Sequence, residues 1–411
     1  MKIAIFSDIF YPQLSGISDS ILETGKELAR RGHQVIYFVP SYSKKDHSHF
    51  DKKDEISDFD KNIHPNISVI RIPSINYPLM FQTRIFSPIN FRLLALKKFK
   101  PDVLHTQSYF SAGIMALIAS RIFKKPLIGT NHTVFSEFFQ FSPIHSRLVK
   151  SIYLKFAYWY YSHCDFLTAP SAWVISDMQS HEKTIKKIPS QVISNPISEE
   201  FYVMNNQQKE EAKLKFKTND YTLIYAGRIS PEKNIETIIK AIALVKKEIP
   251  EVNLLIAGIG KKSYVNRLKE LIFDLNIENR IQFLKLLSHQ DLARAYNASK
   301  IFIIMSTSET QSMVLMQATA CGLPIIAANS KALPEYVKND FGVLVPAKDQ
   351  NKLATEIINL LKNPELEAKM SKKAAIFSQE FRTAKIADLW ENLYSKVIEK
   401  YNKYYGQKPN N

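Results

Sequence analysis

The sequence has only two cysteines among its 411 residues, Cys164 and Cys321. They lie far apart in the chain, so neither a disulfide framework nor a zinc site is expected. Long apolar runs are also missing, because no stretch of about eighteen hydrophobic residues occurs. The first apolar run is broken by Asp8, which favours a strand over a secretion signal. These absences predict a cytoplasmic protein without a membrane span.

Acidic residues are scarce in one quarter of the chain. Residues 61–160 contain thirteen Lys or Arg residues but only two acidic residues, Asp102 and Glu137, which gives an excess of eleven positive charges. No nucleic-acid recognition motif accompanies this charge. Residues 91–100 and 139–163 mix Lys and Arg with aromatic side chains, as interfacial helices do. An anionic membrane surface, and no nucleic acid, is therefore expected as a partner; the alternative is a solvated basic face with its aromatic side chains packed inside a domain.

The length of the chain exceeds what one hydrophobic core usually supports, so two domains are expected. Short apolar runs alternate with amphipathic helical patterns, which is typical of parallel sheets with crossover helices. The charged segment 51–62 lacks periodicity and is interpreted as an exposed loop. Strands are predicted within 2–8, 33–40, 67–73, 102–107, 126–132, 165–171, 222–228, 253–260, 281–286, 300–306 and 324–329, and helices within 19–31, 205–217, 231–248, 311–321 and 387–406.

Two segments about eighty residues apart, 225–234 and 305–324, carry a pattern suited to a sugar nucleotide. Arg228 and Lys233 follow a short apolar strand, where a loop can hold both cations towards an anion. A diphosphate flanked by a sugar and a ribose needs such cations, free backbone N–H groups, and acceptors for the hydroxyls. The alternative is that both residues are ordinary surface cations.

Glu309 and Gln317 supply the candidate acceptors in the second segment. They are eight residues apart, so a helix that starts after Ser308 would place them near one face, two turns from each other. A carboxylate at a helix start can also serve only the helix dipole. The pattern G-x-G at Gly258 is weak by itself, and it does not extend to the dinucleotide-binding G-x-G-x-x-G.

At these residues the sequence resembles the retaining glycosyltransferases of family 4, which have the GT-B fold, and is similar to diacylglycerol glucosyltransferases and phosphatidylinositol mannosyltransferases. Further matching segments are 6–18, 129–133, 169–171 and 194–196. The resemblance implies an α/β protein with two Rossmann-like domains that face each other across a cleft. It implies an acceptor-binding domain at 1–196, a nucleotide-sugar domain at 197–378, and a C-terminal crossover helix at 379–411 that packs on the first domain.

The resemblance also implies roles for individual residues. Arg228 and Lys233 would neutralise the leaving nucleoside diphosphate, and Glu309 would accept hydrogen bonds from the donor sugar. His132 would lie near that sugar, although a lone histidine is more often structural. Further donor contacts would come from the backbone at Gly16, Gly258, Thr310, Gln311 and Ser312, and from the side chain of Gln317. Ser312 and Gln317 depart from the family pattern, which has glycine and glutamate at these positions.

The implied reaction is the metal-independent transfer of a hexose, glucose from UDP-glucose, with retention and without a cofactor. No residue stands out as a nucleophile for a double displacement. The resemblance implies front-face attack, in which the leaving phosphate helps to deprotonate the acceptor. The acceptor would be a lipid at the inner face of the cytoplasmic membrane, where the enzyme binds peripherally, with Asp19 as a candidate acceptor contact. The alternatives are a soluble or cell-surface glycan acceptor, such as a lipopolysaccharide or capsule intermediate, and a catalytically silent relative that only binds nucleotide.

Overall fold

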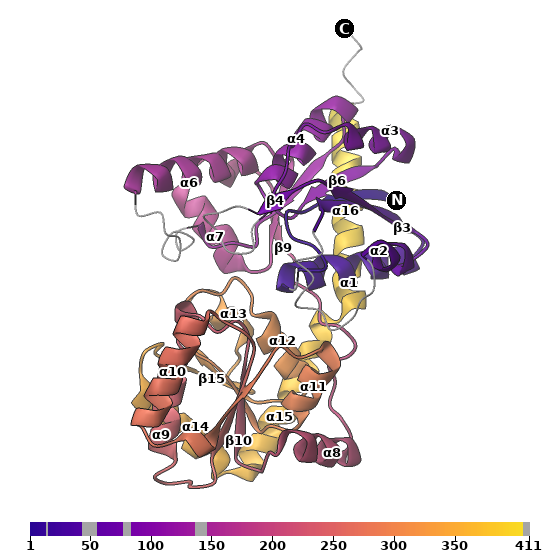
Figure 1. Ribbon diagram of the computed structural model, residues 1–411. Helices are drawn as coiled ribbons and strands as arrows, with labels where there is room; N and C mark the ends of the chain where they lie inside the picture. The colour runs from indigo at the N-terminus through magenta and orange to yellow at the C-terminus, as the bar shows by residue number, and fades with distance from the viewer. Residues whose placement is uncertain (14, 43–55, 77–83, 136–145, 406–411) are drawn as a thin grey trace. The chain divides into compact units, whose positions relative to one another are not determined.

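The computed structural model describes residues 1–13, 15–42, 56–76, 84–135 and 146–405, and the chain divides into two compact units (Figure 1). Unit 1 comprises Met1–Pro196 together with Thr383–Asn411, and unit 2 comprises Ile197–Arg382. A parallel sheet flanked by helices forms the centre of each unit. The α/β class predicted from the alternating pattern is thereby confirmed.

The sheet of unit 1 has seven parallel strands in the order β3-β2-β1-β6-β7-β8-β9. Six of these strands fall in predicted segments, whereas β9 and a separate two-stranded antiparallel pair, β4 and β5, were not predicted. The strands are β1 (Lys2–Phe6), β2 (Gln34–Pro40), β3 (Ile67–Ile72), β4 (Ile75–Asn76), β5 (Arg84–Ile85), β6 (Val103–Thr106), β7 (Leu127–Thr130), β8 (Phe166–Ala169) and β9 (Ser190–Val192). The three missed strands have at most three residues, too few to show a period of two.

The helices of unit 1 include one in a segment that was interpreted as a loop. Residues 56–62 form α2, where Phe59 stacks on Tyr11 and Asp60 pairs with Arg71 at 2.7 Å; residues 51–55 lie outside the described ranges. These tertiary contacts stabilise a helix that has no periodic pattern of its own. The helical elements are α1 (Gly16–Arg30), α2 (Ile56–Asn62), η2 (Phe91–Leu94), α3 (Ala95–Phe99), α4 (Ser111–Phe123), α6 (Arg147–Ser162), α7 (Ala172–His181), η3 (Ile185–Lys187) and α16 (Thr383–Tyr405).

The C-terminal helix α16 is an integral part of unit 1. Its buried residues Trp390 and Tyr394 join the hydrophobic core beneath β1 and α1. Arg31, at the end of α1, bonds to Asp388 and Glu391 at 2.6 Å each. These contacts join residues more than 350 positions apart in the chain, so the first domain depends on the last helix for part of its core.

Unit 2 has six parallel strands in the order β12-β11-β10-β13-β14-β15, of which only β15 was not predicted. The strands are β10 (Thr222–Ala226), β11 (Asn253–Ala257), β12 (Ile281–Leu284), β13 (Ile301–Ile304), β14 (Ile325–Ala328) and β15 (Gly342–Val345). The helical elements are α8 (Asn206–Phe216), η4 (Pro231–Lys233), α9 (Ile235–Val245), α10 (Lys262–Asp274), η5 (Glu278–Arg280), α11 (His289–Asn297), α12 (Met313–Ala320), α13 (Leu333–Tyr336), α14 (Gln350–Leu361), α15 (Pro364–Ser378) and η6 (Gln379–Phe381). None of the helices in the described parts of the chain combines the length and apolar character of a membrane span.

Candidate functional site

The candidate site residues of unit 2 gather beyond the carboxyl ends of neighbouring strands. Residues 227–233 follow β10, and residues 305–312 follow β13, its neighbour in the sheet. Residues 258–260 follow β11 on the other side of β10. In open parallel sheets this edge is where ligands bind. The sheet order therefore brings together segments that lie up to eighty residues apart.

The turns after β10 and β11 approach each other through glycine. The backbone N–H of Ile229 donates to the carbonyl of Ile259 at 2.8 Å, and Gly258 has a φ of +145°. A Cβ at Gly258 would lie 1.9 Å from the carbonyl oxygen of Gly227. Only glycine fits this close contact, and it holds the start of the Arg228 loop in place.

The centre of this site is an ion pair between two predicted residues. Lys233 Nζ lies 2.6 Å from Glu309 Oε1, and both side chains are almost entirely buried. The loop that carries Glu309 is fixed to η4, because the N–H of Thr307 donates to the carbonyl of Glu232 at 3.0 Å. A buried cation and a buried carboxylate are thus held beside each other before any substrate arrives.

Arg228 is also paired, although at a more exposed position. Its Nη2 lies 3.1 Å from Glu232 Oε1, and the guanidinium side chain is 61% exposed. The Glu232 carboxylate is buried and accepts a second hydrogen bond from Ser230 Oγ at 2.5 Å. Two cations and two carboxylates therefore balance at this edge, and an incoming diphosphate would compete with Glu232 and Glu309 for the cations.

The helix predicted within 311–321 is confirmed, but a helix start directly after Ser308 is wrong. The helix α12 begins at Met313, with the side chain of Ser312 accepting from the N–H of Leu315 at its N-terminus. Glu309 lies in the loop before the helix, so it does not share a helical face with Gln317. The N–H groups of Glu309 and Thr310 have no hydrogen-bond partner among the described residues. This loop can thus offer backbone donors to an anion, whereas the donor role of Thr310, Gln311 and Ser312 stays a prediction.

Gln317 lies inside α12 with only 5% of its surface exposed. Its side-chain oxygen is buried and has no hydrogen-bond partner within the described part of the chain. A buried acceptor without a partner is costly unless a ligand supplies the donor. The amide can therefore accept a hydroxyl hydrogen bond, but it lacks the charge of the glutamate that the family pattern has here.

In unit 1, the partly buried His132 follows β7 and belongs to a chain of hydrogen-bonded polar groups that includes the buried Gln107 and His105. Its Nε2 donates to Gln107 Oε1 at 2.7 Å, and Gln107 Nε2 in turn donates to His105 Nε2 at 3.1 Å. The Nε2 of His105 also lies 2.6 Å from Thr130 Oγ1, and its Nδ1 lies 2.8 Å from the hydroxyl of Tyr394 in α16. The network fixes the His132 ring, whose Nδ1 has no partner among the described residues and can accept a hydrogen bond from a hydroxyl.

Both histidines remain uncharged at neutral pH. Burial lowers the pKa of His132 to about 4. Burial, together with the neighbouring His132, lowers the pKa of His105 to about 3. At physiological pH neither ring can serve as a cation for phosphate, so the part of His132 is that of a neutral hydrogen-bonding group.

Gly16 and Asp19 lie at the start of α1, where the carboxyl end of β1 leads into that helix. Gly16 is the first residue of the helix, and the side chain of Ser15 caps it by accepting from the N–H of Ser18. Asp19 is in the first turn. Residue 14, in the predicted donor loop, lies outside the described ranges. The start of α1 and the end of β7 both belong to unit 1. Because α1 begins at Gly16, the unpaired N–H groups of the first helical turn lie at this residue.

Three functional neighbours were not singled out from the sequence: Glu232, Gln107 and Tyr394. Glu232 sits one position before Lys233 and could have been noticed as a partner for Arg228 four residues earlier. No local signal marks Gln107 or Tyr394, because their partners are distant in the chain. Residues 58–60 on α2 also form an Asp-x-Asp triplet. The carboxylate of Asp60 in this triplet is paired with Arg71.

The comparison with known proteins agrees with this architecture. The sequence profile described as "Glycosyltransferase Family 4" matches residues 14–201, and the one described as "Glycosyl transferases group 1" matches residues 206–377. The crystal structure of Anabaena HepE in complex with UDP has a TM-score of 0.76 at 20% identity and covers 96% of this chain and 100% of that one. WaaG, a glycosyltransferase involved in lipopolysaccharide biosynthesis, has a TM-score of 0.68 at 15% identity, covering 96% and 99% of the two chains.

Fold and profiles define the chain as a glycosyltransferase with the GT-B fold. An alpha-monoglucosyldiacylglycerol synthase of Streptococcus pneumoniae is 30% identical over 350 residues, which is 84% of this chain and 75% of that protein. The synthase of the same name from Acholeplasma laidlawii is 26% identical and covers 99% of this chain and 100% of its own. The chain belongs to glycosyltransferase family 4, as the resemblance of its motifs predicted.

Proposed function

We propose that this enzyme transfers glucose from UDP-glucose to a lipid acceptor at an anionic membrane surface, with retention of configuration and without a metal. The observation that carries the proposal is the buried Lys233–Glu309 pair beside unpartnered backbone N–H groups. Two relatives named alpha-monoglucosyldiacylglycerol synthase support a glucosyl group and a diacylglycerol acceptor. HepE, whose structures contain UDP and UDP-glucose, supports the donor.

In this reaction the bond between the anomeric carbon and the diphosphate oxygen breaks, and a bond from that carbon to the acceptor oxygen forms. Negative charge develops on the leaving diphosphate, which Lys233 and Arg228 stabilise more strongly in the transition state than in the ground state. When the diphosphate engages Lys233, Glu309 is released to accept hydrogen bonds from the sugar. The acceptor hydroxyl passes its proton to the leaving phosphate oxygen, as front-face attack requires.

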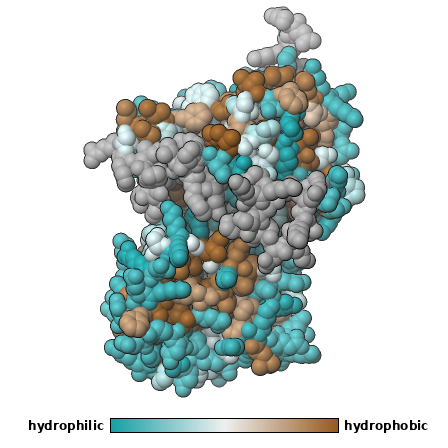
Figure 2. Space-filling view, in the orientation of Figure 1, coloured by the Kyte–Doolittle hydropathy of each residue, from teal (hydrophilic) through white to brown (hydrophobic). Residues whose placement is uncertain are grey.

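A basic and apolar face of α6 supports the membrane part of the proposal. Leu148, Ile152 and Trp159 are 70%, 59% and 46% exposed, and with Lys155 they fall on one stripe of the helix. The aromatic residues of the opposite stripe, including Tyr160 and Tyr161, are buried in the core. Figure 2 shows hydrophobic surface on unit 1 near the place where Figure 1 has α6. Apolar side chains flanked by lysine are suited to insertion among anionic headgroups.

The second predicted interfacial segment, 91–100, folds as η2 and α3, whereas residues 139–145 lie outside the described ranges.

Replacing Ile152 and Trp159 with Ser is expected to weaken binding to vesicles that contain phosphatidylglycerol by about tenfold or more, because two apolar side chains no longer leave water. Sedimentation with such vesicles measures the effect. A matched control is Leu214→Ser, which removes an 80% exposed apolar side chain from α8 in unit 2. Equal sedimentation of the double variant, the control and the unmodified protein would refute the membrane role of α6.

The reaction itself is tested with purified protein and a panel of sugar nucleotides, with and without anionic vesicles that contain diacylglycerol. The expected result is release of UDP from UDP-glucose and formation of a glucosylated lipid only when vesicles are present. Release that instead depends on an added soluble glycan would favour the alternative acceptor. Binding of UDP without release from any donor would identify a silent relative, which the departures at Ser312 and Gln317 keep as the second alternative.

A further inference from the structure

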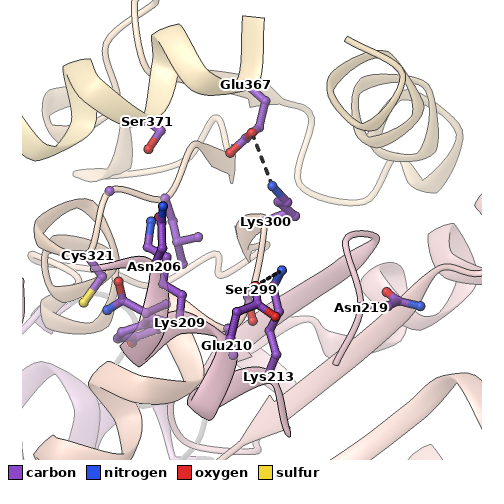
Figure 3. Close-up of a pocket in the computed structure, with 15 residues that line it drawn as sticks. Asn206, Lys209, Glu210, Lys213, Asn219, Ser299, Lys300, Cys321, Glu367 and Ser371 are labelled. Atoms are coloured by element: carbon purple, nitrogen blue, oxygen red, sulfur yellow. Dashed lines mark hydrogen bonds and ion pairs between the residues drawn. The ribbon is translucent and has the colours of Figure 1, made fainter. Parts of the chain in front are cut away.

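Unit 2 contains a cavity of about 250 Å³ that no part of the proposed reaction uses. It lies between α8 and α15, beside residues that come just before strands (Figure 3). Lys300 precedes β13, and Leu323 precedes β14. The donor residues follow the same strands, and parallel strands share their direction. The cavity is therefore at the opposite edge of the sheet from Lys233 and Glu309.

Three lysines reach this cavity, two from α8 and one from the residue before β13. Lys209 and Lys213 are one turn apart on α8, and Lys300 directly precedes β13 (Figure 3). Lys213 is neutralised by Glu210 at 2.9 Å, whereas Lys300 is 3.8 Å from Glu367, a loose contact. Lys209 Nζ has no hydrogen bond or ion pair with any residue that the structure describes. One cation is thus left without a partner, next to another that is weakly held.

The surroundings of Lys209 disfavour its charge in the empty cavity. Burial lowers the pKa of its ammonium group most, and the neighbouring Lys300 lowers it further. Glu367 and Cys321 oppose this with smaller effects on the pKa, and Lys213 adds the smallest lowering effect. An anion in the cavity would reverse this penalty, because it would supply the missing countercharge. The side chains of Asn206 and Ser371, which also line the cavity, have no partner among the described residues and can donate further hydrogen bonds.

We propose that this cavity binds a small soluble phosphorylated anion, with Lys209 and Lys300 contacting its phosphoryl oxygens and Asn206 and Ser371 donating to its remaining oxygens. A phosphoryl group accepts several charge-assisted hydrogen bonds at once, which suits two lysines flanked by polar donors. The volume is below the roughly 300–1,000 Å³ of pockets for drug-sized ligands. It suits pyrophosphate or a sugar phosphate.

The site also has a structural route to the donor residues, a step that rests on the proposed function. Cys321, Gly322 and Leu323 line the cavity and directly follow α12. The other end of α12 is capped by Ser312, next to the Glu309 loop. A ligand that contacts one end of this eight-residue helix is expected to change the affinity for UDP at the other end by a few-fold, and UDP must change the affinity for the ligand equally.

Calorimetric titration of pyrophosphate and of glucose 1-phosphate into the full-length protein tests the site. Lys209→Gln is expected to weaken binding about tenfold, because one charge-assisted contact is lost. Lys215→Gln is the matched control on the same helix; its lysine pairs with Asp291 and does not line the cavity. Circular dichroism checks that both variants remain folded.

Two outcomes would overturn the site: no binding of either compound, or equal affinity in Lys209→Gln. If UDP also displaces that unchanged binding fully, the anion is bound at the donor residues. Phosphorylated lipid headgroups share the same chemistry, so binding to vesicles with phosphatidic acid is measured as well. Lys209-dependent binding to these vesicles alone would overturn a soluble ligand.

UDP affinity measured with and without pyrophosphate tests the coupling between the cavity and the donor residues. An unchanged UDP affinity would refute the coupling while leaving UDP binding, and so the proposed function, intact.

Discussion

Replacing Glu309 with Ala is expected to lower kcat by about a thousandfold, while the affinity for UDP is unchanged or higher. The carboxylate is buried and ready to accept hydrogen bonds from the sugar, so its loss removes an interaction with the transferred group. The same change frees Lys233, whose ammonium group forms an ion pair with Glu309 at 2.6 Å in this structure. A freed ammonium group remains available to the diphosphate, which is why binding and turnover should respond differently.

The two effects are separated by measuring steady-state rates with UDP-glucose and UDP affinity by calorimetry. Glu270→Ala, which removes an exposed carboxylate from α10, serves as the control and should leave both quantities unchanged. Glu309→Gln should be intermediate, because an amide can still accept a hydrogen bond but carries no charge. A rate for Glu309→Ala within a few-fold of the unmodified enzyme would show that Glu309 is not in the reacting part of the site.

The juxtaposition of Lys233 and Glu309 could be anticipated because it depends on sheet order. Each follows a strand, β10 and β13, and the carboxyl ends of parallel strands share one edge of a sheet. The start of α12 could not be fixed in the same way. Ser308 and Ser312 are both good N-terminal caps by residue type, and only the folded backbone selects Ser312.

Contacts that form between distant parts of the chain left no trace in the local pattern. His105 and Tyr394 are 289 residues apart, and their 2.8 Å hydrogen bond exists because α16 returns to unit 1. The ion pair between Arg228 and Glu232 is local, at a spacing of four residues, but it was not predicted either, because Arg228 and Lys233 were interpreted as two cations free for phosphate. The structure adds that this part of the site is electrically balanced before the donor binds, so a diphosphate must displace carboxylates rather than fill an empty cationic site.

The largest expected effect on stability comes from Gly258→Ala. The new methyl group would lie 1.9 Å from the carbonyl oxygen of Gly227, and neither backbone can move without breaking the hydrogen bond from the N–H of Gly227 to the carbonyl of Ala257. The φ of +145° adds strain for any residue with a Cβ. A loss of about 3 kcal/mol or more in the free energy of unfolding is expected, together with weaker UDP binding, because the turn holds the loop that carries Arg228.

The matched control is Gly322→Ala in the same unit. Its φ is also positive, at +77°, but the nearest atoms to a new Cβ are side-chain atoms of Val203 at 3.0 Å and Ser371 at 3.2 Å, which can shift. We expect a loss of about 1–2 kcal/mol there, the ordinary cost of a left-handed conformation. Urea unfolding, followed by a probe of unit 2, measures both variants. If Gly258→Ala costs no more than Gly322→Ala, then the close approach of the two turns does not hold the Arg228 loop, and the backbone there yields more easily than the 1.9 Å contact implies.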